Sequence, residues 1–287
     1  MGQIINRFMK LILIISFALL GLASAKSQNT IVPDTVFEQF LIDSGIDTGL
    51  IDGIVPTASI NSVTSLTMLF LNITDLTGIE DFSGLESIRC AYSQLTKIDL
   101  SMNYLLSDIK VDNNLLDTLI LPSSNSLIEL SCGNNLLSEL NVSSYVNLEL
   151  LYCLNNLITH LDLSYNTQLH ALQTYNNPLL CLNVKNGNNI NMTSFGGGNS
   201  PDLICIEVDS ADWATLNWSL SWVGSVLFSE SCKNSCSSGT VGFTEQPKIS
   251  KKLIRIIDLF GNKSKVRKNE LLIYIYNDGS VEKKYHY

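Results

Sequence analysis

Seven cysteines and three histidines are the side chains of this 287-residue chain best suited to nucleophilic or metal chemistry. Three of the cysteines, Cys90, Cys132 and Cys153, share one column of a 21-residue repeat. Zinc ligands come in pairs only a few residues apart, so this spacing does not predict a metal site. A thiol that recurs in one column behaves instead as a small apolar side chain.

The histidines do not form a catalytic set either. His160 and His170 fall at variable positions of the repeat, and His286 lies near the end of the chain. Asp162 is close to His160, but the same column carries Asp99, which indicates a solvated residue. The sequence contains no G-x-S-x-G, H-E-x-x-H or phosphate-loop motif. We therefore expect no enzymatic activity, cofactor or metal.

The 21-residue repeat returns five times, without insertion, between positions 85 and 189. Each copy reads L-x-x-L-x-C-x-x-N-x-L and then adds two more apolar positions. The columns begin with Leu85, Ile88, Cys90, Ser93, Leu95, Ile98 and Leu100. The alternation at Leu130-x-Cys132 predicts one short strand per copy. One copy cannot bury its apolar face alone, so stability must come from stacked copies.

One polar column is as regular as the apolar ones. It consists of Asn114, Asn135, Asn156 and Asn177, with Ser93 in the first copy. At a corner of a coil, an Asn amide can bond the backbone of its own and the neighbouring turn. The alternative is that these are ordinary loop residues.

The pattern resembles the leucine-rich repeat family, and five tandem matches make chance an unlikely origin. The resemblance implies a right-handed solenoid of 21-residue coils with a short parallel β-sheet, few helices, a cap at each end and a small C-terminal β-hairpin region. The domains we expect are a signal peptide (1–25), an N-terminal cap (26–65), the repeats (66–204), a C-terminal cap (205–240) and a basic β-rich tail (241–287).

The N-terminus has the pattern of an export signal. Arg7 and Lys10 precede an apolar run over residues 11–22, and small residues at 23–25 predict cleavage before Lys26. The run is too short for a membrane span, so we expect no transmembrane segment after signal removal. Export to an oxidising compartment would make the protein secreted or surface-exposed and permit disulfides.

The N-terminal cap is expected to contain a helix over 35–42. A shortened first repeat follows. We expect Leu66, Leu69 and Leu71 to occupy core columns, with Met68 and Phe70 facing outward.

At the other end, Ile190, Thr193 and Phe195 are expected to continue the columns. Cys205 beside Ile-Glu-Val-Asp, three Trp residues and Cys232 then resemble the terminal cap of exported bacterial leucine-rich repeat proteins. That resemblance implies a Cys205–Cys232 disulfide. Cys181 and Cys236 leave the full connectivity open, and an odd number of cysteines leaves at least one unpaired.

The tail reverses the charge of the chain. Residues 241–287 hold 10 of the 18 basic and 5 of the 27 acidic residues, whereas residues 27–240 hold 22 acids against five basic residues. An acidic solenoid repels phosphate, so we expect no nucleic-acid partner. Two strands and a hairpin are predicted over 253–284. The tail looks similar to C-terminal sorting segments of type IX secretion substrates, which implies contact with secretion machinery; alternatively, it packs on the acidic solenoid.

What remains is recognition through the concave face of the solenoid. Side chains that alternate with the buried ones should project there; they are apolar or aromatic in the first and last coils and polar in the middle ones. The exposed Leu and Tyr either form a binding platform or merely cover the sheet and pack under the C-terminal cap. We expect the ligand, a protein or a surface glycan, to contact Tyr152, Tyr175, Gln173, Leu150 and Leu154. The alternative is a structural envelope or assembly solenoid without a specific ligand.

Overall fold

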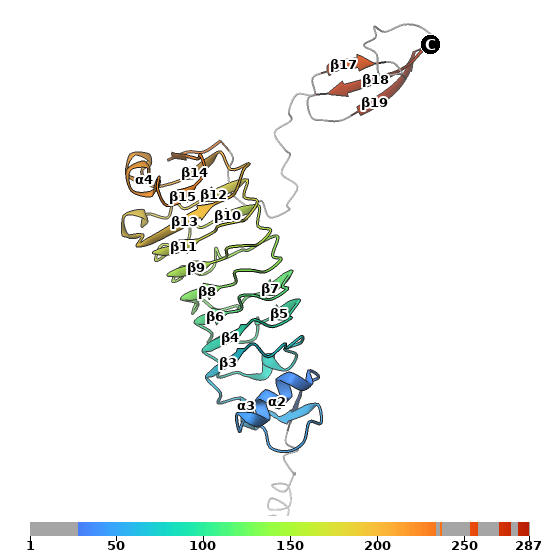
Figure 1. Cartoon of the computed structure of the whole chain (residues 1–287), viewed down its shortest axis with the longest axis vertical. Helices are drawn as coiled ribbons and strands as arrows, with labels where there is room; N and C mark the ends of the chain where they lie inside the picture. Colours follow the sequence, from blue (N-terminus) through green and yellow to red (C-terminus); the bar gives the residue numbers. More distant parts are fainter. Residues whose placement is uncertain (1–27, 234–235, 237–252, 258–269, 277–280, 287) are drawn as a thin grey trace, which may run out of the picture. The chain divides into compact units, whose positions relative to one another are not determined.

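The computed structural model describes residues 28–233, 236, 253–257, 270–276 and 281–286. The chain divides into two compact units, 1–238 and 239–287. The first unit is a leucine-rich repeat solenoid, in which parallel strands of successive coils lie beside one another (Figure 1). The expected signal peptide falls outside the described residues. None of the helices in the described part is long and apolar enough to cross a membrane.

One face of the solenoid is a parallel sheet of eight strands, here called the long sheet. Its strands follow the chain in order along the coils (Figure 1). They are β3 (Ser65–Leu69), β4 (Ser87–Ala91), β6 (Asp108–Lys110), β8 (Glu129–Ser131), β9 (Leu150–Tyr152), β11 (Ala171–Gln173), β13 (Ser194–Gly198) and β15 (Trp222–Val223).

A second strand, which we did not predict, occurs in most coils on the side opposite the long sheet. Two parallel sheets form there. The first pairs β5 (Lys97–Asp99) with β7 (Thr118–Ile120), and the second contains β10 (His160–Asp162), β12 (Cys181–Asn183), β14 (Cys205–Glu207) and β16 (Leu227–Ser229). The cause is a second period-two pattern, such as Leu161-x-Leu163, whose two side chains are both buried.

The interior is built from the predicted columns. In the five uniform copies, every residue of the Leu85, Ile88 and Leu95 columns is buried. Cys90, Cys132 and Cys153, the core thiol column, are buried and free. Burial in this apolar core raises the thiol pKa to about 11 for Cys90 and about 12 for Cys153. The three thiols are therefore neutral packing groups, as the sequence predicts.

The asparagines of the repeat, here called the corner column, bond two coils at once. Asn135 Nδ2 donates to the carbonyls of Cys132 in its own coil and Val111 in the preceding coil, both at 3.0 Å. Its Oδ1 accepts from the Leu116 N–H at 3.0 Å. Asn114, Asn156 and Asn177 make the equivalent contacts. The column satisfies backbone groups that the bend removes from the sheet.

The N-terminal cap consists of the antiparallel pair β1 (Asn29–Ile31) and β2 (Ile54–Pro56) with helices α2 (Thr35–Asp43) and α3 (Thr57–Ile60). Asp34 caps α2, as its carboxylate accepts from the N–H groups of Val36 and Phe37 at 2.9 Å. Buried Glu38 accepts from the Asp52 and Gly53 N–H groups and holds the following turn. The cap covers the first coil, which would otherwise expose apolar core to water.

The expected register of the first coil is wrong. β3 pairs with β4 so that Met68 lies opposite Cys90, and Met68 is fully buried. Ile73, not Leu71, takes the next buried position, and a 3-10 turn η1 (Ile79–Asp81) follows. Because Leu66 pairs with Ile88, this coil is one residue longer than the uniform copies. The sequence predicts a coil shorter than the uniform copies. This error in register places Met68 on the outward face, whereas it lies in the core.

The last coils also depart from the uniform spacing. Phe195 pairs with Leu172, which makes that coil two residues longer than the uniform copies and leaves Ile190 exposed. A 3-10 turn η2 (Asn189–Asn191) accommodates the extra residues. Partly buried Met192 packs against the core near the place expected for Ile190.

The C-terminal cap contains α4 (Ala211–Trp218), whose Trp218 stacks on Phe195 with ring centroids 4.1 Å apart. The Cys205–Cys232 disulfide implied by the resemblance is present. The second disulfide joins Cys181 to Cys236, which settles the connectivity that the sequence left open.

The second unit contains three antiparallel strands, β17 (Leu253–Ile257), β18 (Glu270–Tyr276) and β19 (Val281–His286). β18 pairs with β19 from Glu270 opposite His286 to Ile275 opposite Val281. This is the hairpin expected from the sequence.

Candidate functional site

The outward side chains of the long sheet form columns, because its strands pair in register. The first column runs through Ser87, Asp108, Glu129, Leu150, Ala171 and Ser194; the second runs through Arg89, Lys110, Ser131, Tyr152, Gln173 and Gly196. Just beyond the strand ends, Asp112, Gly133, Leu154 and Tyr175 occupy equivalent positions of their coils. The face is thus polar and charged in the middle coils and apolar or aromatic in the later ones.

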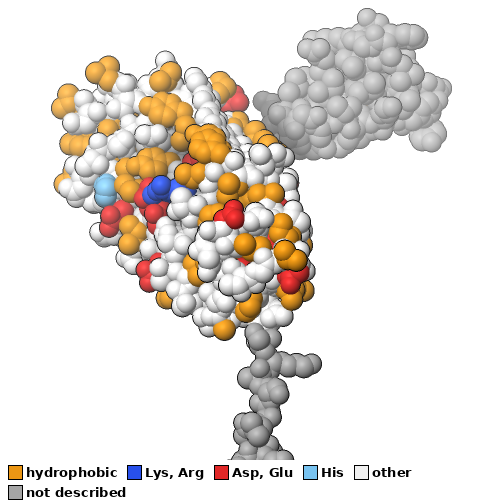
Figure 2. All heavy atoms as spheres, turned by 60° about the horizontal axis from the view of Figure 1, so that its bottom comes forward, with side chains coloured by type: hydrophobic (Ala, Val, Ile, Leu, Met, Phe, Trp, Pro, Cys, Tyr) orange, Lys and Arg blue, Asp and Glu red, His pale blue; other side chains and the backbone are white. Residues whose placement is uncertain are grey.

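The charged part, here called the charged cluster, consists of Asp108, Lys110 and Glu129. Lys110 Nζ lies 2.8 Å from Glu129 Oε2 and 3.1 Å from Asp108 Oδ1. Partial burial lowers the pKa of Lys110, but its bonds to the two carboxylates outweigh that effect and raise the pKa overall. Figure 2 shows basic side chains bordered by acidic ones, with hydrophobic side chains on the surface around them.

Asp112 holds the next coils in place beside this cluster. Its Oδ1 accepts from the Ser131 hydroxyl at 2.7 Å and from the Gly133 N–H at 2.8 Å. Burial raises the pKa of Asp112 more than these two hydrogen bonds lower it. A side chain at Gly133 would press on Leu154, because a Cβ there would lie 3.0 Å from Leu154 Cδ2. Asp112 is therefore part of the scaffold.

The five predicted contact residues, here called the sheet-face patch, are all partly exposed. Tyr152 lies directly opposite Gln173 on the neighbouring strand, next to Leu150 in its own strand. Tyr175 is not level with Tyr152; it lies two positions beyond Gln173, in the column of Leu154. The patch is therefore wider along the strands than a single row.

Tyr175 is also attached to the C-terminal cap. Its hydroxyl donates to the Ser221 carbonyl at 3.4 Å. Its ring leaves no room for a side chain at Gly196, where a Cβ would lie 2.7 Å from the Tyr175 hydroxyl oxygen. Tyr175 is thus held against the cap, and Tyr152 is the aromatic ring at the centre of the patch.

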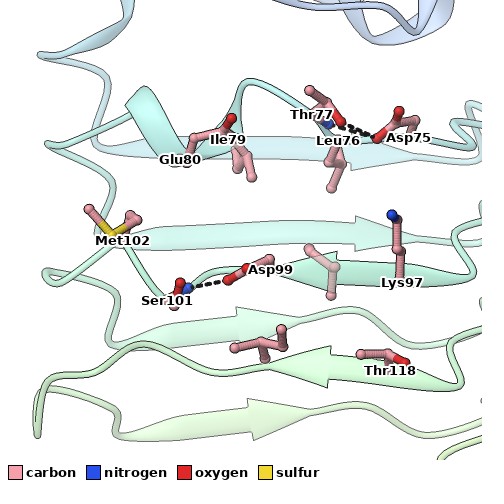
Figure 3. Close-up of a pocket in the computed structure, with 12 residues that line it drawn as sticks. Asp75, Leu76, Thr77, Ile79, Glu80, Lys97, Asp99, Ser101, Met102 and Thr118 are labelled. Carbon is pink, nitrogen blue, oxygen red and sulfur yellow. Dashed lines mark hydrogen bonds between the residues drawn. The ribbon is translucent and has the colours of Figure 1, made fainter.

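A pocket of about 460 Å³ opens on the opposite side of the solenoid, around β5 and β7. Figure 3 shows Lys97 and Asp99 on β5, Thr118 on β7, and Asp75 and Glu80 on the preceding coil. The carboxylates of Asp75 and Asp99 accept from the backbone N–H groups of Thr77 and Ser101. The hydrogen bonds from Ser101 lower the pKa of Asp99. These acids stabilise turns, and Asp75 also accepts from the Thr77 hydroxyl at 2.8 Å.

Two of the histidines, His160 and His170, lie on the outside of the repeats. His160 contacts Thr159, and His170 Nε2 lies 3.5 Å from Glu149. Asp162 accepts from the Ser164 N–H at 3.0 Å, so it belongs to a turn. In the described part of the chain, no three His, Cys, Asp or Glu side chains come together as a metal site needs.

A set of residues that the sequence reasoning missed lies at the rim of the long sheet. Seven residues at equivalent positions of their coils have a left-handed backbone there; these residues, here called the rim column, are Phe70, Tyr92, Asn113, Asn134, Asn155, Asn176 and Asn199. In the first coil Asn72 is left-handed as well, with φ 58°. The signal was present in the sequence, since Tyr92 stands one repeat before Asn113. Phe70 was expected to face outward, but its pairing with Tyr92 was not foreseen.

No family model and no curated protein matches the chain. Among solved structures, the functional domain of InlJ from Listeria monocytogenes, described as including a cysteine ladder, is 23% identical with a TM-score of 0.42. That match covers 63% of this chain and 38% of the InlJ chain.

Two internalins of the same organism are also similar. For InlF the identity is 16%, the TM-score 0.48 and the coverage 72% of this chain and 74% of the other. For internalin C2 the values are 15%, 0.32, 65% and 100%. At these identities the likeness concerns the fold alone.

Proposed function

We propose that the chain is a non-catalytic, exported recognition module that binds a protein partner through the outward face of the long sheet. The observation that carries this proposal is the position of Tyr152. It is partly exposed between Leu150 and Leu154, in the same column as Lys110 of the charged cluster.

An apolar and aromatic patch beside fixed charges suits a protein interface. Tyr and Leu side chains supply contact area, and the aromatic anchor contributes most when water is excluded around it. Charged groups at the border select the partner and its orientation. The charged cluster is pre-organised, since Lys110 already bonds both carboxylates. One disulfide lies within the C-terminal cap and the other ties the cap to the repeats at Cys181; both agree with a protein that folds in an oxidising compartment.

The test is a screen of purified surface and secreted proteins with the full chain as bait, read by surface plasmon resonance. A protein that binds should lose at least about tenfold in affinity with Tyr152→Ala, and more with Leu154→Ala added, because both remove contact area from the patch. Tyr165→Ala is the matched control, since Tyr165 is 62% exposed in the turn that follows β10.

The thermal midpoint of the Tyr152 variant should equal that of the parent, because the ring is partly exposed. A partner bound equally by parent and variant would refute the role of this face. If no protein in the screen binds, the structural alternative, a solenoid for envelope assembly, becomes the better account.

For the second unit we propose the role that its sequence resemblance implies, a sorting signal read by secretion machinery. The support is that residues 239–287 form a compact unit of their own. Cell fractionation of a chain that ends at Ser238, in a host with type IX secretion, tests this: the truncated protein should stay in the periplasm. Normal surface display or release would leave the tail without a sorting role.

A further inference from the structure

The rim column contains an exception that stability does not explain. Asn is the residue that best tolerates the left-handed region after glycine, and it fills the last five positions with φ between 53° and 57°. The first two positions hold Phe70, with φ 60°, and Tyr92, with φ 58°. Bulky aromatic residues rarely adopt this backbone, so their presence in an Asn column requires a reason.

The two rings stack on each other at the surface. Their centroids are 4.3 Å apart and their planes differ by 16°. Phe70 is 66% exposed and Tyr92 50% exposed, so neither ring fills the core. This stack offsets only part of the cost of holding two non-glycine residues in the left-handed region. Strain of this kind is typical of ligand-binding positions.

The surroundings of the pair indicate what it binds. Three amide side chains are near in the fold: Asn72 and Gln94, each two residues after a member of the pair and with their amides 3.5 Å apart, and Asn113, the next residue of the rim column. Asp112 is the acidic residue next to Asn113 in the sequence. Its Oδ1 already accepts hydrogen bonds from the Ser131 hydroxyl and the Gly133 N–H. The pair is thus an aromatic surface bordered by neutral donors and acceptors.

The amides continue along the solenoid. Asn155 Nδ2 donates to Asn134 Oδ1 at 2.6 Å, and the same bond links Asn176 to Asn155 and Asn199 to Asn176. Each Nδ2 has two hydrogens, so one N–H of each of these amides remains for another acceptor. The result is a row of linked amides from Asn134 to Asn199 at one-coil intervals of about 4.8 Å, and Asn113 stands between this row and Tyr92 in the rim column.

We propose that Phe70 and Tyr92 form a binding platform for a neutral carbohydrate chain, whose hydroxyl groups bond the amides of the rim column. The C–H groups of a sugar ring pack on aromatic side chains, and uncharged amides match hydroxyl groups as donors and acceptors. This site is distinct from the sheet-face patch, so it does not depend on the protein partner proposed above.

The test measures binding of cellohexaose, laminarihexaose, mannohexaose and xylohexaose to the full chain by isothermal titration calorimetry. We expect at least one of them to bind with Kd in the millimolar range or below. The variant Phe70→Asn/Tyr92→Asn places the residue of the rim column at both positions, and it should weaken that binding at least tenfold. Its thermal midpoint should rise, because the strained aromatic residues are gone.

Two further variants keep the outcome clear. Tyr92→Phe retains the ring and should bind within about twofold of the parent, even if the double variant folds poorly. Tyr165→Asn removes an exposed tyrosine elsewhere and should leave binding unchanged.

The proposal is overturned if none of the four oligosaccharides binds the parent, or if the double variant binds as well as the parent. Loss of a protein partner in the double variant, without any bound oligosaccharide, would assign the pair to a protein interface and also refute it.

Discussion

The corner column offers the sharpest test of the fold, through the variant Asn135→Ala. The substitution leaves the buried Leu116 N–H without its acceptor, because Asn135 Oδ1 is the partner at 3.0 Å. A stranded buried donor costs about 1–3 kcal/mol. The carbonyls of Val111 and Cys132 are less affected, since Asn114 and Asn156 also donate to them at 3.1 and 3.0 Å. We therefore expect a loss of about 2–4 kcal/mol, the stranded donor plus weakened bonds at two carbonyls.

Asparagines of neighbouring coils donate to the same carbonyl, so a double variant provides a stricter test. In the double variant Asn135→Ala/Asn156→Ala, the Cys132 carbonyl loses both of its amide donors. The loss should then exceed the sum of the single losses by about 0.5–3 kcal/mol. Asn114→Ala/Asn156→Ala is the matched control, because these two side chains bond no common carbonyl and should be additive.

The assay is equilibrium unfolding in guanidinium chloride, followed by circular dichroism with the disulfides intact. Exposed Asn125→Ala gives the baseline for removing an asparagine that plays no part in the corner column. If Asn135→Ala costs no more than Asn125→Ala, the corner argument fails. If both double variants are equally additive, the carbonyls are not shared in the way described.

Three other results follow from the structure. Burial raises the thiol pKa values of the core thiol column, so the neutral thiols stabilise the fold fully below the ordinary thiol pKa of 9.0, and this stabilisation is lost as the pH rises toward about 11. The free energy of unfolding, measured as a function of pH, should show this loss, whereas a variant with Val at all three positions should not. Gly198→Ala should cost about 2 kcal/mol or more in thermal unfolding, since a Cβ would lie 2.4 Å from the Val223 carbonyl at φ 138°, whereas Gly187→Ala, with positive φ but open space, should cost less; equal losses would contradict the clash. Ending the chain at Ser238 should leave the thermal midpoint of the solenoid unchanged, because the first unit is compact by itself; a large drop would show that the tail stabilises it.

The repeat made much of this fold predictable. Five copies of identical length fix every core column, and a column of Asn cannot be buried without backbone partners. The prediction failed where the length changes. Met68 and Ile190 were misassigned because the first coil and the last one before the cap are both longer than the uniform copies. Period-two patterns place residues correctly only relative to a known register.

The candidate site was less predictable than the core. Alternation alone shows that Tyr152 projects from the sheet. It does not show that Tyr175 bends onto Gly196 and the cap, because that contact joins residues of different coils. The rim column was missed for a further reason. Asn marks the left-handed backbone at 113, 134, 155 and 176, but Phe70 and Tyr92 carry no such mark, so only their position in the repeat indicates their conformation.

The uniform coil length has a consequence for how such a protein can change over generations. An in-frame duplication or loss of one 21-residue segment within residues 85–189 joins two equivalent positions, so every column continues across the junction. Both ends keep their caps. Where the change falls between Tyr92 and Tyr152, the distance between these two rings, three coils or about 14 Å along the stack, would lengthen or shorten in steps of about 4.8 Å. The number of repeats can therefore set the distance between the two proposed binding surfaces through gene duplication or deletion, without any change to either surface.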